Sequence, residues 1–320
     1  MTFDNIPTVD LNQYLHGSEA DRKAFSQQLG DTFSGIGFAI VANHGVSAEL
    51  IANAYNVFER FFALPDDVKS QYEIAGIAGQ RGYTGKGKEH AKGRNTGDLK
   101  EFFHIGQEVT DGDPIKSEYH DNVSVAEIPE LAEYGVALYQ GLQFAGVNLL
   151  RAIADYLDLP NPYFDDKVHN GNSILRPIHY FPIENPDEIP ADAVRAAEHE
   201  DINLITLLIG ASADGLQVKG SDGNWVAAKP QPNEIVINVG DMLQRLTNNR
   251  LKSTTHRVVN PPRALMHLPR FSVPFFLHPK SDMNLACLDS CISTENPKSY
   301  PDCTAGEYLN ERLREIGLKK

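Results

Sequence analysis

The sequence contains little cysteine and tryptophan: 3 cysteines and 1 tryptophan among 320 residues. The cysteines, Cys287, Cys291 and Cys303, are an odd number crowded near the C-terminus, so they do not form the disulfide framework of a secreted domain. A zinc site built on them would need a fourth ligand and a closer Cys-x-x-Cys spacing. We therefore expect surface or core thiols in a reducing cytoplasm.

Long hydrophobic runs and an excess of positive charge are also missing. No stretch approaches about 18 consecutive apolar residues, which excludes a transmembrane helix. The segment MTFDNIPTVDLNQYL has no basic start followed by an apolar run, so we expect no secretory signal. The formal net charge of −14 would repel nucleic acid and anionic lipid. We expect a cytoplasmic protein that acts on a small molecule, with neither a nucleic-acid nor a membrane partner.

The distribution of apolar residues changes near residue 171. Before it, apolar residues recur with helical spacing in ADRKAFSQQLGDTFSGIG and, over a longer stretch, at 127–158. Residues 78–97 are rich in glycine and polar residues, which predicts a long loop. After residue 171, short β-rich runs alternate with turn residues, which favours a β-sandwich or barrel. The sequence therefore predicts a helical first half supporting a β-rich second half.

The segment AAEHEDINLITLLIG, at 196–210, carries the strongest chemical signal. If a strand begins near His199, its two-residue period places His199 and Asp201 on one face. His256 follows much later, at the start of another β-rich run. Two histidines and one carboxylate form the facial triad of non-haem Fe(II) enzymes, which leaves three coordination positions open. We interpret these three residues as the metal ligands and the catalytic centre.

A possible carboxylate clamp follows on the next β-rich run, RFSVPFFL. Arg270 and Ser272 are two residues apart, so a strand would place both side chains on the same face. A guanidinium can bind a carboxylate through two hydrogen bonds, and the hydroxyl can add a third. Such a clamp suits the distal carboxylate of 2-oxoglutarate.

Several motifs, in order, resemble the isopenicillin-N-synthase-like family of Fe(II)/2-oxoglutarate-dependent oxygenases over essentially the whole chain. They are HED, GDMLQRLTNNRLKSTTHRVV and RFSVPFFL in the second half, IPTVDL, GFAIVANHGV, RGYTGKGKE and DLKEFFHIG in the first, and YPDCTAGEYLNERL near the end. The resemblance implies a mixed α/β fold with an all-β core, a distorted double-stranded β-helix (jelly roll) flanked by N-terminal and C-terminal helices. It also implies a division into an N-terminal region at 1–125, a scaffold helix at 126–170, the jelly-roll core at 171–280 and a C-terminal helical extension at 281–320.

The resemblance also implies roles for individual residues. His199, Asp201 and His256 match the iron ligands, and Arg270 and Ser272 match the clamp. In the segment LRPIHYFP, Tyr180 matches a tyrosine that bonds the same carboxylate. Many members have Asn-x-Tyr there, whereas this chain has Ile178 at the asparagine position. Arg176, nearby, could help to orient the co-substrate.

The expected reaction uses Fe(II), 2-oxoglutarate and O₂, with ascorbate as a reductant, and oxidises a C–H bond, most often by hydroxylation. Three alternatives remain open at this point. The first is an oxidase of the same fold that uses no 2-oxoglutarate. The second is an ethylene-forming enzyme that consumes 2-oxoglutarate itself. The third is a jelly-roll metal-binding protein without catalytic activity, although such a protein has no use for a dicarboxylate clamp.

The segment KGKEHAKGR concentrates positive charge in an otherwise acidic chain, in Lys86, Lys88, Lys92 and Arg94. If it lies over the cavity, it could attract an anionic substrate by local steering. The alternative is an ordinary solvated loop.

Overall fold

Two β-sheets organise the computed structural model, which describes residues 5–77, 79–88, 100–183, 185, 194–210 and 215–315. Within these residues, the larger sheet has the strand order β1-β2-β11-β8-β13-β5-β4-β3, and β6 pairs with β13 and β4. Its strands are β1 (Thr8–Asp10), β2 (Phe38–Ala42), β3 (Gly82–Thr84), β4 (Lys100–Gly106), β5 (Ile174–Leu175), β6 (Ile178–Tyr180), β8 (Ile205–Ile209), β11 (Ile235–Val239) and β13 (Arg270–Leu277). The smaller sheet has the order β10-β9-β12-β7, formed by β7 (Ala196–His199), β9 (Leu216–Lys219), β10 (Trp225–Ala227) and β12 (His256–Val258).

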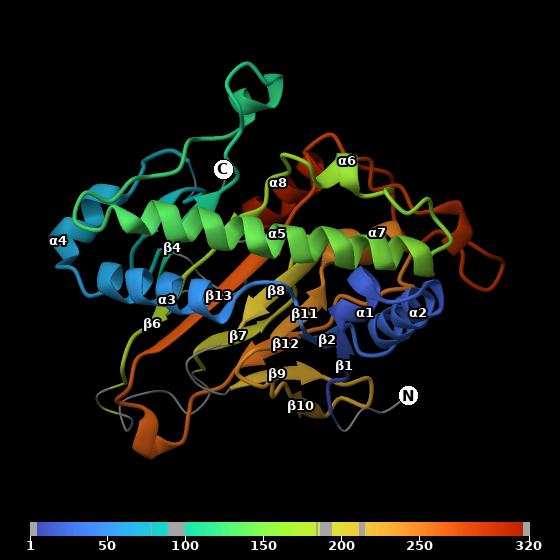
Figure 1. Ribbon diagram of the computed structural model, residues 1–320, viewed down its shortest axis with the longest axis horizontal. Coiled ribbons are helices and arrows are strands. Elements are labelled where there is room, and N and C mark those ends of the chain that lie inside the picture. The colour runs from blue at the N-terminus through green and yellow to red at the C-terminus, as the bar shows by residue number, and fades with distance from the viewer. Residues whose placement is uncertain are drawn as a thin grey trace.

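Helices cover one face of the larger sheet. Figure 1 shows α5 and α3 side by side across this face, with α1 and α2 next to them. The α-helices are α1 (Leu11–His16), α2 (Glu19–Gly35), α3 (Ala48–Phe62), α4 (Asp66–Lys69), α5 (Glu130–Tyr156), α6 (Asp165–Val168), α7 (Asp241–Leu246) and α8 (Ala305–Glu315). Short 3₁₀ helices are η1 (Ser70–Tyr72), η2 (Pro114–Glu118), η4 (Arg263–Leu265) and η5 (Asp289–Cys291).

Local sequence explains where the main helices form. Ser18 caps α2 through a capping box with Asp21, and its predicted apolar residues are fully buried. Ser47 caps α3, where its hydroxyl accepts a hydrogen bond from the Leu50 N–H at 3.1 Å. The glycine at 146 lets α5 approach the larger sheet, because a Cβ there would lie 2.8 Å from a methyl group of Leu277. The predicted helices are therefore present.

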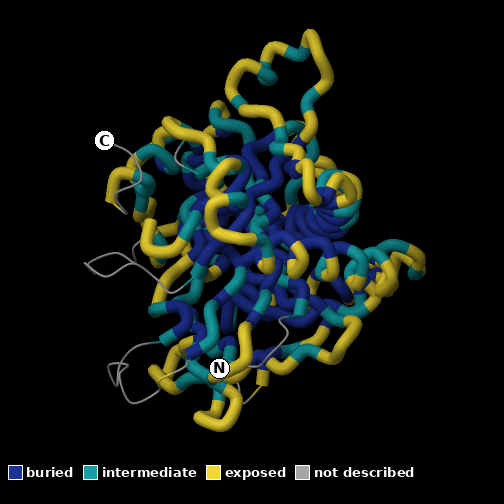
Figure 2. The backbone as a smooth tube through the Cα atoms, turned by 90° about the vertical axis from the view of Figure 1, so that its left-hand side faces the viewer, coloured by how far each residue is buried: buried dark blue, intermediate teal, exposed yellow. Residues whose placement is uncertain are grey.

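Alternation along the strands divides the larger sheet into two faces. Ile205, Leu207 and Ile209 of β8 join the core beneath the helices. On the opposite face, Phe38 of β2 and Val236 of β11 pack in one cluster with residues of the smaller sheet: Ala196, Leu216, Val218, Val226 and Val258. The two sheets therefore face each other, and buried residues occupy the middle of the molecule while exposed residues follow its loops (Figure 2). The fold is mixed α/β with a large β-sheet core.

Two predictions about local structure were wrong. The loop predicted at 78–97 is interrupted by β3, whose backbone pairs with β4. Within the predicted loop, residues 78 and 89–97 lie outside the described residues. Three paired residues are too short a run to show periodicity in a glycine-rich sequence. The strand predicted to begin near His199 instead ends there. After it, the Asp201 carbonyl accepts from the Asp241 N–H at 2.7 Å, so this segment bonds to the start of α7 and not to a neighbouring strand.

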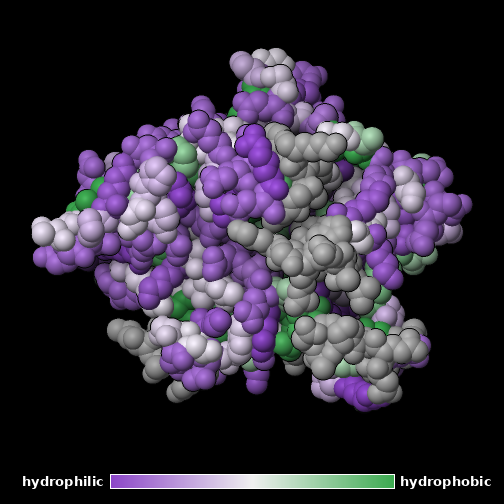
Figure 3. Space-filling model, turned by 180° about the vertical axis from the view of Figure 1, so that it is seen from behind, coloured by the Kyte–Doolittle hydropathy of each residue, from purple (hydrophilic) through white to green (hydrophobic). Residues whose placement is uncertain are grey.

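No helix among the described residues is long and apolar enough to cross a bilayer. Among the described residues visible from behind in Figure 3, most are hydrophilic and the hydrophobic side chains form small patches.

Candidate metal centre

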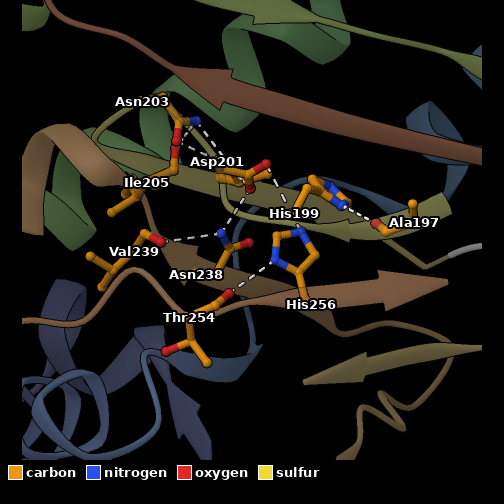
Figure 4. A network of polar contacts seen from close by, with 10 residues as sticks. Ala197, His199, Asp201, Asn203, Ile205, Asn238, Val239, Thr254 and His256 are labelled. Carbon is orange, nitrogen blue, oxygen red and sulfur yellow. Dashed lines mark hydrogen bonds and ion pairs between the residues drawn. The ribbon is translucent and has the colours of Figure 1, made fainter. Parts of the chain in front are cut away.

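The three predicted metal ligands meet where the smaller sheet meets the turn after β7. His199 at the end of β7 pairs in register with His256 at the start of β12, and their ring centres are 4.2 Å apart. Asp201 follows in the turn, with Oδ1 3.9 Å from His256 Nε2. One ligand atom from each residue lies within 4.8 Å of the others. Figure 4 shows the three side chains pointing toward one another.

Backbone carbonyls fix how both imidazoles present their nitrogens. His199 Nδ1 lies 2.7 Å from the Ala197 carbonyl oxygen, and His256 Nδ1 lies 3.1 Å from that of Thr254. A carbonyl can only accept, so each Nδ1 must carry the proton and donate it. In the neutral rings, each Nε2 then keeps its lone pair for a metal, which is the usual arrangement of metal-binding histidines.

Hydrogen bonds from other described residues hold the Asp201 carboxylate by one of its two oxygens. Its Oδ2 accepts from Thr206 Oγ1 at 2.6 Å and from Asn238 Nδ2 at 2.8 Å. Thr206 is itself fixed by Asn203, whose Nδ2 donates to its hydroxyl at 3.0 Å. Oδ1 receives none of these bonds and lies on the side of His256. This oxygen can therefore bind a metal without breaking the network in Figure 4.

The protonation states of His199 and Asp201 also suit the binding of a metal cation. Burial lowers the pKa of His199 to about 4, with a further contribution from repulsion by His256, although part of the side chain is exposed. Burial by itself would raise the pKa of Asp201. The two imidazoles and the hydrogen bonds from Thr206 and Asn238 outweigh this effect, so the pKa lies below its usual value. A neutral imidazole and an ionised carboxylate are the forms that coordinate metals.

The residues predicted to bind the co-substrate carboxylate lie where β13 begins and β6 ends. Arg270 pairs in register with Tyr180, and its guanidinium carbon lies 5.1 Å from the centre of that ring. Arg270 and Ser272 are both buried, with exposed fractions of 1% and 3%. Further along the same face of β13, Phe276 pairs with Thr206, which binds Asp201. One face of β13 therefore leads from Arg270 to the metal ligands.

Arg176 lies between β5 and β6, beside a histidine and two aromatic rings. Its Nε donates a hydrogen bond to His104 Nε2, and its guanidinium carbon lies 4.5 Å from the ring centre of Phe102 and 5.2 Å from that of Phe276. Ile178, at the position where relatives often have asparagine, is buried against Phe102 and Tyr180. The surface between Arg176 and Tyr180 is thus apolar.

His104 leads to a prediction about pH. Burial holds its pKa well below the usual value, so the folded protein keeps this ring neutral. The unfolded chain takes up the proton near pH 6.5, which makes the protein lose stability as the pH falls below that value. Between about pH 7.5 and about pH 5.5, one such histidine should lower the unfolding free energy by about 1.4 kcal/mol. Chemical denaturation of His104→Gln at both pH values should show a pH dependence smaller by this amount; equal pH dependences would contradict it.

A cluster of charged residues centred on the fully buried Glu101 lies behind this region. Glu101 accepts from Lys69 Nζ at 2.8 Å and from Tyr83 Oη at 2.6 Å, and it lies 2.7 Å from His179 Nδ1. Its exposed fraction is 0%, and His179 stacks on Phe271 with ring centres 4.8 Å apart. Glu101 of β4 pairs in register with His179 of β6, and both side chains lie on the face of these strands opposite to Tyr180. Lys69 belongs to α4 and Tyr83 to β3, so the cluster connects four elements behind the clamp.

Glu101→Gln should be strongly destabilising because it removes the buried anion of the Lys69 ammonium, which then keeps the exposed Asp66 carboxylate, 3.0 Å from its Nζ, as a partner. Removing one partner of a buried pair costs about 3–5 kcal/mol. The exposed pair of Arg60 and Glu130 provides the matched control, and Glu130→Gln should cost less than about 1 kcal/mol. Denaturant titration of both variants tests this, and a similar small loss in each would contradict the structural role of the cluster.

Sequence reasoning missed several of these residues. Thr206, Asn238 and Glu101 were not predicted to have any role. Asn238 had a usable signal, because it is a polar residue within the apolar run EIVINVG.

Two cations of the positively charged segment KGKEHAKGR have contacts in the structure. Lys86 Nζ lies 5.3 Å from the ring centre of Phe181, and Lys88 pairs with Glu73. The other cations of this segment, Lys92 and Arg94, lie outside the described residues.

Comparisons with known proteins agree over both halves of the chain. Residues 6–127 match the family model described as non-haem dioxygenase in morphine synthesis N-terminal, and residues 171–279 match the 2OG-Fe(II) oxygenase superfamily. The 2-oxoglutarate-dependent dioxygenase frbA of Dothideomycetidae sp. is 31% identical, with 97% of this chain and 96% of that protein covered. The dioxygenase ecdK of Aspergillus rugulosus is also 31% identical, with 96% and 98% covered.

Solved structures show the same relationship. A 2OG-Fe(II) oxygenase family protein from Caulobacter crescentus superposes with a TM-score of 0.88 at 44% identity, with 98% of this chain and 100% of that chain covered. A full-length Neurospora crassa protein in complex with alpha-KG (2-oxoglutarate) and thymine superposes with a TM-score of 0.86 at 30% identity, with 97% and 96% covered. The chain therefore belongs to the isopenicillin-N-synthase-like family of Fe(II)/2-oxoglutarate-dependent oxygenases, as a dioxygenase that uses Fe(II), 2-oxoglutarate and O₂ to oxidise a small molecule.

Proposed function

We propose that this dioxygenase hydroxylates an unactivated C–H bond of a small molecule at an iron held by His199, Asp201 and His256. The observation that carries the proposal is the cluster of three ligand atoms within 4.8 Å of one another. Both histidines of this cluster have Nδ1 on a backbone carbonyl, and Asp201 has one oxygen tied to the protein. Two imidazoles and one carboxylate on one side of a metal fit Fe(II) and leave room for co-substrate and O₂.

Arg270, Ser272 and Tyr180 are proposed to bind the distal carboxylate of 2-oxoglutarate. A buried guanidinium gives two parallel charge-assisted hydrogen bonds to a carboxylate, and hydroxyl groups beside it can donate others. Arg176 is proposed to contact the co-substrate or the substrate from the far side of Ile178. Its guanidinium is already held by His104 and two aromatic rings, so little conformational entropy is lost on binding.

When bound, Fe(II) supplies the activation of O₂, which couples oxidative decarboxylation of the 2-oxo acid, giving succinate and CO₂, to oxidation of the substrate C–H bond. The protein contributes position and exclusion of water. Thr206 and Asn238 keep the Asp201 carboxylate oriented, and the Ala197 and Thr254 carbonyls keep the imidazoles oriented. Phe102 and Ile178 provide an apolar wall that shields the region from solvent.

The two facing sheets are proposed to form a distorted double-stranded β-helix, a jelly roll. The proposed functional regions are 1–125, 126–170, 171–280 and 281–320. We also propose that the protein acts in the cytoplasm and on a small molecule, without a nucleic-acid or membrane partner. The Neurospora crassa relative was crystallised with thymine, so pyrimidines belong among the candidate substrates.

The experiment that tests this function measures succinate formation and O₂ uptake with Fe(II) and ascorbate across a metabolite panel. Succinate formation that a particular metabolite stimulates, together with a hydroxylated product, is expected. O₂ uptake and product formation without 2-oxoglutarate would support the oxidase alternative. Ethylene in the headspace would identify an ethylene-forming enzyme. A protein that binds Fe(II) and never decarboxylates 2-oxoglutarate across the panel would be catalytically idle.

A further inference from the structure

Arg195 is a buried cation for which the proposed function has no role. It directly precedes β7 and has an exposed fraction of 6%. Its Nη2 donates to the Leu268 carbonyl at 3.0 Å, two residues before Arg270. Its Nε is buried and has no hydrogen-bond partner among the described residues. Within the ranges that the structure describes, no carboxylate forms an ion pair with Arg195. A buried guanidinium without an anion is costly, which indicates that an anion binds there.

The surroundings of Arg195 identify the end of the site at which it lies. Burial lowers the pKa of Arg195, repulsion by Arg270 lowers it further, and Tyr180 opposes both effects. These electrostatic interactions and the bond to Leu268 place Arg195 close to Arg270 and Tyr180. The segment after Tyr180 reaches the same turn, because the Ile183 N–H donates to the Met266 carbonyl at 2.9 Å.

The direction of β7 separates Arg195 from the predicted metal ligands. Arg195 is four residues before His199, and an extended chain rises roughly 3.3 Å per residue, so their backbones lie on the order of 10 Å apart. Arg195 therefore approaches the clamp end of the site, from the smaller sheet, whereas Arg270 approaches it from the larger sheet. A carboxylate that binds between two converging guanidinium groups is attracted by both of them.

We propose that Arg195 is a second guanidinium for the distal carboxylate of 2-oxoglutarate, which binds between Arg195 and Arg270 and joins the two sheets. This inference rests on the proposed 2-oxoglutarate site. It makes Arg195 a residue that favours 2-oxo acids with a distal carboxylate over those without one. No sequence pattern pointed to this role, because Arg195 is outside the motifs of the triad and the clamp.

The test compares 2-oxoglutarate with 2-oxopentanoate, which has the same 2-oxo acid end and no distal carboxylate. Binding of each acid to the Fe(II)-loaded enzyme is measured by calorimetry without O₂, for the wild type, Arg195→Gln and Arg270→Gln. Losing a charge-assisted hydrogen bond should weaken 2-oxoglutarate binding to Arg195→Gln at least about tenfold. Binding of 2-oxopentanoate should change by less than about twofold, because this acid lacks the group that Arg195 contacts.

The outcomes separate this inference from the function on which it rests. An equal change for both acids in Arg195→Gln, or no change, overturns the role of Arg195 if Arg270→Gln still discriminates between them. If Arg270→Gln does not discriminate either, the proposed clamp itself is wrong. Should Arg195→Gln not fold, Arg195→Lys takes its place. Lysine keeps the charge and loses the planar fork, so a smaller loss confined to 2-oxoglutarate is expected, and equal changes for both acids overturn the inference.

Discussion

Asp201→Ala is expected to lower Fe(II) affinity by more than about 100-fold and to abolish turnover at ordinary metal concentrations. Changing groups that merely support a metal ligand costs about 10–100-fold in affinity, so losing a ligand should cost more. The variant also removes the negative charge of the site and leaves the Thr206 hydroxyl and the Asn238 amide without their shared acceptor. The measurements are iron retained after desalting and succinate formed.

The neighbouring carboxylate provides the control for this variant. Glu200 Oε1 accepts from Thr255 Oγ1 at 2.7 Å and is exposed, so it belongs to another network. Glu200→Ala should keep Fe(II) affinity and turnover within about threefold of the wild type, as surface substitutions usually change free energies by less than about 0.5 kcal/mol. Full turnover in Asp201→Ala would refute the ligand assignment.

Arg270→Ala should raise the KM for 2-oxoglutarate by about 10–100-fold while Fe(II) affinity stays near that of the wild type. The reason is the loss of a charge-assisted, bidentate contact worth roughly 1.5–3 kcal/mol. Because Arg270 is buried beside Tyr180, solvent cannot easily replace this contact. Initial rates over a range of 2-oxoglutarate concentrations give the KM, and equilibrium dialysis gives the iron affinity.

Arg257 is the matched control for Arg270. Its Nε donates to Gln217 Oε1 at 3.0 Å, and its guanidinium carbon lies 3.9 Å from the Trp225 ring centre, with Glu198 at 3.6 Å. These contacts place it away from the clamp residues. Arg257→Ala should therefore leave the KM for 2-oxoglutarate unchanged. Similar increases in both variants would indicate a general loss of structure and contradict a specific role for Arg270.

Local patterns were enough to predict the parts of the protein that depend on neighbouring residues. Helical spacing of apolar residues predicted α2 and α5, because each helix forms its hydrogen bonds within a short segment. The two-residue period of a strand placed Arg270 and Ser272 on one face of β13, because successive side chains of any strand point to opposite faces. The prediction that a strand begins at His199 was wrong, because the segment after His199 bonds to α7, which is far away in the sequence.

The sequence by itself determined the family, and it predicted the chemistry of His199, Asp201 and His256 and a carboxylate clamp, since these predictions follow from residue types in a fixed order. Only the tertiary structure decided which nitrogen each imidazole presents, that Asn238 fixes Asp201, and that Arg195 converges on Arg270. Each of these depends on hydrogen bonds or charges between segments distant in the chain. Such contacts leave no periodic or local signal, because the fold alone sets the distances between their atoms.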